Sequence, residues 1–199
     1  MKKFVFASLA LLLTLSIPSH AQDDKRLKIG VVDFQNQTGD ASNDSLVKGI
    51  SDIMLNEMQK AGAYRLIERK RFDNVLSELK LNMSGLVDAN NAKQVGNQLG
   101  VDALVFGNLT SVIPSSKKHT ILIMWTERQM IAVNLDARIV DVGTGEVLKT
   151  AKVTQEIHSR KWVAFGFAKI GSIMDKNSMI QKGIEEGCEK LAKELSKNK

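Results

Sequence analysis

The stretch IAVNLDARIVDVGTGEVLKTAKV, residues 131–153, decides how this chain folds. Its apolar residues alternate with polar ones, the alternation stops at Gly143-Thr144-Gly145, and it then resumes. Alternation with a period of two is typical of a half-buried strand, and a glycine-rich break between two such runs predicts a tight turn. The stretch therefore predicts a long β-hairpin with one face in the core and one in water.

The same alternation assigns side chains to the two faces of the hairpin. The face that we expect to be buried carries Ile131, Val133, Leu135, Ala137 and Ile139 on the first strand, and Val147, Ala151, Val153 and Ile157 on the return strand. The opposite face carries charged residues such as Asp136, Arg138 and Lys152. A charged outer face favours a plain sheet of the core over a dedicated binding hairpin.

Helices and further strands flank the hairpin on both sides. We expect strands at 27–34, 64–68 and 101–113, the last ended by Pro114. We also expect amphipathic helices at 46–61, capped by Asn43 or Asp44, and at 72–79, 88–99 and 178–196. The predicted order along the chain is β-α-β-α-α-β-β-β-α. The fold class that follows is α/β, a mixed sheet with helices packed on it.

The first residues have the pattern of an export signal. Lys2 and Lys3 precede an apolar run, and Ser19-His20-Ala21 places small residues before a cleavage site. We expect a cleaved signal peptide at 1–21, a flexible stub at 22–26 and a single domain at 27–199, located in the periplasm or associated with the outer membrane. The single cysteine, Cys188, leaves no lipid-bearing cysteine after the signal and no internal disulfide.

Residue types that carry chemistry are sparse and scattered. Outside the signal, the two histidines, His119 and His158, do not have metal-ligand spacing, and Asp33 is expected to cap the loop after its strand. Motifs for nucleotide, metal or acyl chemistry are missing from the sequence. We therefore predict no enzyme, no catalytic residue, no cofactor, no metal site and no small-molecule substrate.

The charge distribution does not point to a nucleic-acid partner. The formal net charge is +6, and the basic residues are dispersed, with small clusters at 68–71 and at Lys117-Lys118. Dispersed cations usually form a solvated face, and no basic stripe interleaved with aromatics points to nucleic acid. Weak attraction to anionic lipids remains open.

Aromatic side chains gather in two stretches late in the chain. HTILIMWT at 119–126 contains Trp125, and the stretch 160–178 contains Trp162, Phe165 and Phe167. Three interpretations are open: core or a flap over the core, a protein contact surface, or a segment that enters a membrane. We take Trp125, Trp162, Phe165 and Phe167 as the candidate interaction surface. Each stretch is long enough for one strand but hardly for two strands and a turn.

An ordered set of motifs resembles the CsgG family of curli secretion and outer-membrane assembly proteins. The motifs are D-F-x-N-x-T-G from Asp33, R-L-I-E-R from Arg65, G-V-D-A-L-V-F-G from Gly100 and D-x-x-T-G-E-V from Asp141. The resemblance implies a periplasmic α/β domain. The type member forms a ring, threads two hairpins per subunit through the outer membrane and makes a secretion pore, and a related branch activates cell-wall synthases.

This chain departs from that pore-forming pattern. It lacks the lipid-bearing cysteine, its loop at 35–44 has no aromatic residue, and its two aromatic stretches are short. These stretches occupy the hairpin positions of the family, at 114–130 and 154–178, and we expect them to be shortened remnants that lie on the domain.

The prediction that results is a non-enzymatic periplasmic component of envelope assembly or secretion that acts by protein–protein contact. Envelope or secretion proteins are its expected partners. The resemblance allows a homo-oligomer, such as a ring, and contact with the outer membrane. The alternative is a regulator of a cell-wall synthase.

Overall fold

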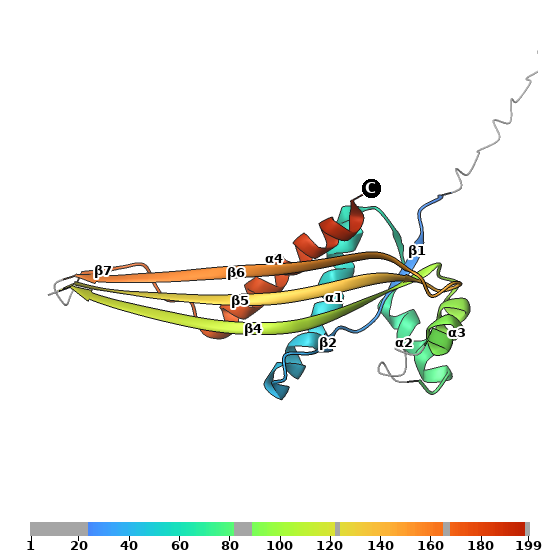
Figure 1. The fold of residues 1–199 in the computed structure, drawn as a ribbon, viewed down its shortest axis with the longest axis horizontal. Coiled ribbons are helices and arrows are strands. Elements are labelled where there is room, and N and C mark those ends of the chain that lie inside the picture. Colours follow the sequence, from blue (N-terminus) through green and yellow to red (C-terminus); the bar gives the residue numbers. More distant parts are fainter. Residues whose placement is uncertain (1–23, 82–88, 122–123, 165–167, 198–199) are drawn as a thin grey trace, which may run out of the picture.

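One mixed sheet organises the molecule, with helices on both of its faces (Figure 1). The computed structural model describes residues 24–81, 89–121, 124–164 and 168–197. The strands are β1 (Lys28–Val31), β2 (Gln35–Asn36), β3 (Arg65–Leu66), β4 (Ala103–Ile121), β5 (Met124–Asp141), β6 (Val147–Ala164) and β7 (Ala168–Ile170). The helices are α1 (Asp44–Ala61), α2 (Arg69–Glu78), α3 (Ala89–Leu99) and α4 (Lys176–Ser196), with a 3-10 turn at Ala41–Asn43.

The sheet has the order β3-β1-β4-β5-β6-β7, and β2 pairs with β4 outside this path. Strands β3, β1 and β4 run parallel, whereas β4, β5, β6 and β7 form antiparallel pairs. The predicted α/β class and the predicted sequence of elements are confirmed, and the structure adds the short strands β2 and β7.

Two apolar cores lie on opposite faces of the sheet. The larger core joins α1 and α4 to one face, and the hairpin residues Ile131, Val133, Leu135, Ala137 and Ile139 all contribute to it. The smaller core places α2 and α3 against the other face, at the end where β1 lies (Figure 1). Apolar spacing of three and four residues gives each helix one buried face, as the sequence indicates. Gly62, at φ +69°, ends α1 where the sequence predicts.

Polar side chains on the inner face of β6 hold α4 in place. Gln155 is only 6% exposed, and its amide donates to Glu186 at 2.5 Å and accepts from Lys190 Nζ at 2.5 Å. Lys149 donates to the carbonyl oxygens of Leu195 and Lys197, at the end of α4. A strand that is apolar in pattern therefore also carries the polar contacts that fix the position of the helix.

Two sequence predictions about this sheet are wrong. Pro114 does not end its strand, because β4 continues to Ile121. Beyond Leu109, the described part of β4 pairs only with β5, so a residue that lacks an N–H is tolerated at the free edge. Val147 is not buried but 53% exposed, because an irregularity in the register after Ile139 moves it to the opposite face, next to Val140.

Candidate interaction surface

The long strands continue past the helices as an extension of the sheet (Figure 1). We call this extension the distal sheet and define it as residues 115–121 of β4, 124–130 of β5, 158–164 of β6, and β7. In β4, β5 and β6, 19, 18 and 18 residues in a row keep the strand conformation. The expectation of shortened remnants lying on the domain is therefore wrong: residues 114–130 supply the ends of two strands, which project away from the helices.

Cross-strand pairing places the candidate aromatic residues. Trp125 pairs with Val163, and Trp162 pairs with Thr126. Residues directly opposite each other share a face, and neighbours along a strand point to opposite faces, so the two tryptophans lie on opposite faces of the distal sheet. Trp125 shares the face of α4, and Lys161 Nζ lies 5.5 Å from its ring centroid. Trp162 shares the other face and is 42% exposed.

Trp125 and Trp162 therefore do not belong to one continuous patch. Phe165 and Phe167 lie outside the described residues. The two tryptophans offer two separate contact points, one on each face of the same extension. Sequence alternation around Trp162 could have assigned it a face, but the pairing with Trp125 depends on a register that only the folded sheet shows.

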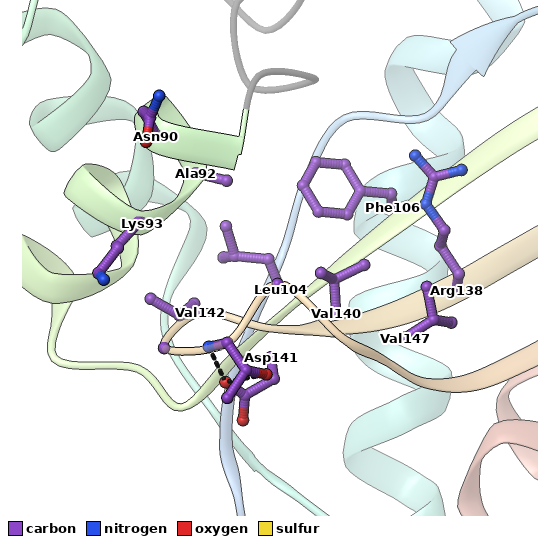
Figure 2. A pocket seen from close by; sticks show the side chains of 13 residues that line it. Asn90, Ala92, Lys93, Leu104, Phe106, Arg138, Val140, Asp141, Val142 and Val147 are labelled. Atoms are coloured by element: carbon purple, nitrogen blue, oxygen red, sulfur yellow. Dashed lines mark hydrogen bonds between the residues drawn. The ribbon is translucent and has the colours of Figure 1, made fainter.

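A pocket of about 450 Å³ opens on the face of α3, beside the turn between β5 and β6 (Figure 2). Its apolar lining comes from Leu104, Phe106, Val140, Val142 and Val147. Arg138 lies over the Phe106 ring at 5.6 Å from the centroid, and Lys93 reaches the pocket from α3. Asp141 and Thr144 also line the pocket, so its surface combines apolar side chains with two cations and one carboxylate.

The turn beside this pocket is the one that the sequence predicts at Gly143-Thr144-Gly145. The backbone N–H of Thr144 donates to Asp141 Oδ1 at 2.8 Å, and this hydrogen bond lowers the pKa of Asp141. Gly145 has φ +76°, in the region that glycine favours. The hydrogen bond and the glycine together fix the entry of β6 at the side of the pocket.

Asp33 has a different role from the one predicted. Its carboxylate does not cap the following loop but forms an ion pair with Arg69 at the start of α2, and Arg69 Nε also lies 3.3 Å from Asp73. Burial lowers the pKa of Arg69, but the hydrogen bond to Asp33 and nearby carboxylates raise it on balance. The ion pair holds the segment just after β1 against the start of α2.

The two histidines lie on the distal sheet, His158 at its end nearest the helices and His119 further out. His119 and His158 are both exposed. Within the described ranges, no group of three or more His, Cys, Asp or Glu side chains is arranged to hold a metal ion. Among the helices of those ranges, none combines the length and the apolar character that crossing a bilayer requires.

Comparison with known proteins identifies a family. The family model described as "Curli production assembly/transport component CsgG" matches residues 11–199. A search of curated proteins finds no significant match. Solved structures that are similar include lipoprotein GNA1162 from Neisseria meningitidis, which is 18% identical, with a TM-score of 0.49 and coverage of 67% of this chain and 84% of that one.

Two further structures are similar at the same level. The PelC dodecamer from Paraburkholderia phytofirmans is 12% identical, with a TM-score of 0.48, and 87% of this chain and 90% of that one are covered. The LpoB C-terminal domain from Salmonella enterica is 15% identical, with a TM-score of 0.45 and coverage of 66% and 85%. Since the family model spans the bulk of the chain, this protein belongs to the CsgG family.

Proposed function

We propose that this protein is a CsgG-type component of assembly or transport in the bacterial cell envelope, and that it acts by contact with proteins and not by catalysis. The observation that carries the proposal is the distal sheet, which extends past the helices and presents a tryptophan on each face. The family description, an assembly and transport component, supports the same class of function.

The physical argument rests on exposed surface. Trp162 remains 42% exposed, and large aromatic side chains on the surface of a domain are over-represented where proteins bind one another. The described edge of β4 beyond Leu109 has no strand partner, and a free edge can accept a further strand. A ring of copies and an envelope partner would both use these features.

The test is the size of the protein purified from the periplasm of a bacterial host, measured by analytical ultracentrifugation with and without outer-membrane vesicles. We expect assembly or co-sedimentation of the wild type, and its loss in Trp125→Ser and Trp162→Ser with unchanged thermal unfolding. Leu148→Ser is the matched control, because Leu148 is a 41% exposed apolar residue at the opposite end of β6 and does not line the pocket of Figure 2. A protein that stays monomeric and does not co-sediment with the vesicles would contradict a role in assembly.

The same preparation separates the alternative function. Co-purification from envelope extract followed by mass spectrometry identifies what binds the wild type and not the tryptophan variants. Recovery of a cell-wall synthase would favour a regulator, whereas recovery of secretion or fibre proteins would favour transport. Both outcomes keep protein contact as the activity and differ only in the partner.

A further inference from the structure

Three cations lie in one row across the distal sheet. Lys117 of β4 pairs directly with Arg128 of β5, and Arg128 pairs directly with Arg160 of β6. Adjacent strands are about 4.8 Å apart, so the three positions span about 10 Å on one face. We call Lys117, Arg128 and Arg160 the cation row. Like charges directly opposite one another repel, so this arrangement is unfavourable unless something compensates for it.

No compensation comes from the described part of the protein. All three side chains are exposed, and none forms an ion pair or a side-chain hydrogen bond with another described residue. A hollow of about 510 Å³ lies beside the row, lined by Lys117, Arg128 and Arg160 together with Ser115, Met130 and His158. The hollow lies next to the three cations that repel one another, so an anion bound in it would reduce this repulsion.

The opposite face of the same strands shows the ordinary arrangement. There Lys118 pairs with Glu127, and Glu127 pairs with Lys161, so an acidic residue stands between two basic ones. We call Lys118, Glu127 and Lys161 the mixed row. The two rows are displaced by a single residue along each strand, and they differ in that the central position holds Glu127 in one and Arg128 in the other.

We propose that the cation row is a binding site for a ligand with clustered phosphate groups. Each phosphate group of such a ligand is negatively charged near neutral pH and offers non-bridging oxygens that accept charge-assisted hydrogen bonds. The guanidinium groups of Arg128 and Arg160 match such oxygens in pairs, and Lys117 adds a point charge. An extended peptide places carboxylates with one charge each on one face every ~7 Å, so an acidic peptide is the competing ligand that the experiment must compare.

Two sources supply this chemistry, a free polyphosphate and the headgroups of anionic lipids. Trp162 lies on the same face, since its partner Thr126 is two residues from Arg128. An exposed tryptophan beside cations is typical of a surface that meets lipid headgroups, but a free polyphosphate would use the cation row alone. This site goes beyond the proposed function, because it binds phosphate groups and not a protein. Assembly of the protein can be measured without phosphate, so the two proposals can fail separately.

The experiment compares two double variants that lose the same charge from opposite faces. Lys117→Gln/Arg160→Gln removes the ends of the cation row, and Lys118→Gln/Lys161→Gln removes the ends of the mixed row. The full chain is titrated with sodium tripolyphosphate by calorimetry, and is sedimented with phosphatidylcholine vesicles with and without phosphatidylglycerol. We expect the cation-row variant to bind at least about tenfold more weakly, since hydrogen bonds between charged groups are lost, and the mixed-row variant to stay within about twofold of the wild type.

The outcomes distinguish the two sources of phosphate and test the proposal itself. Tripolyphosphate binding that depends on the cation row supports a free polyphosphate, and binding only to vesicles with phosphatidylglycerol, with the same dependence, supports lipid headgroups. Arg128→Lys keeps the charge but loses the paired donors, so it should fold normally and bind more weakly than the wild type but more tightly than the cation-row double variant. The proposal is overturned if neither probe binds, if both double variants weaken binding equally, or if a hexaglutamate peptide binds as tightly as tripolyphosphate.

Discussion

At the scale of single residues, the cysteine shows how burial governs reactivity. Cys188 lies in the larger core with no exposed surface. Burial is the main reason that its pKa rises from 9.0 to about 12, and Glu57 adds to the shift. Only a thiolate attacks alkylating reagents, so a thiol with this pKa should be inert at neutral pH.

We predict that iodoacetamide leaves Cys188 unmodified at pH 8 in the folded protein and modifies it rapidly in denaturant, as mass spectrometry would show. The same shift makes stability depend on pH. An unfolded thiol ionises near pH 9 and the folded one only near pH 12, so the free energy of unfolding should fall as pH rises between these values. Cys188→Ala is the reference for that slope. Fast modification of the folded protein would contradict the burial.

At the scale of elements, the contact between β6 and α4 depends on a buried amide. Gln155 bridges Glu186 and Lys190, which are one helical turn apart on α4. Gly183 and Gly187 let the helix approach the sheet, because a Cβ at these positions would lie within 3 Å of Val133 and Leu135 respectively. The helix is therefore close enough for a glutamine to reach both of its charged partners.

Gln155→Ala should lower the free energy of unfolding by about 1 kcal/mol, because two part-buried hydrogen bonds would be lost while Glu186 and Lys190 can still be solvated. Urea denaturation followed by circular dichroism measures the change. Thr154→Ala is the control, since Thr154 is the exposed neighbour on the opposite face, and it should stay within about 0.5 kcal/mol of the wild type. Equal effects of the two substitutions would show that the amide bridge contributes nothing.

The helices and strands could be predicted from periodicity, but the register between strands and the contacts between distant residues could not. The apolar spacing of α1, α4 and the hairpin is local, and the structure agrees with it. The face of Val147 depends on a register irregularity, the ion pair of Asp33 joins positions 36 residues apart, and Lys117, Arg128 and Arg160 meet only through pairing. Lys117 and Lys118 form one basic cluster in the sequence, but the pairing places them in rows on opposite faces of the sheet.

At the scale of the whole molecule, the sheet has a protected part and an unprotected part. Near β1, strand β4 has neighbours on both sides, and helices cover both of its faces. Beyond Leu109, within the described chain, β4 pairs only with β5, and most side chains at 113–120 are exposed. Local opening costs little free energy where few apolar contacts are buried, so the two parts of one strand should differ in stability.

Hydrogen exchange measured by mass spectrometry should therefore separate the two parts of β4. We expect amides of residues 112–121 to exchange roughly tenfold faster or more than those of 103–109, a difference of at least ~1.4 kcal/mol in the free energy of opening. Residues 131–139 of β5, which are paired on both sides, serve as the internal control. Equal protection of both parts would mean that another strand occupies the free edge of β4. Dilution then distinguishes its origin, because an edge covered by a second copy loses its protection as the protein concentration falls.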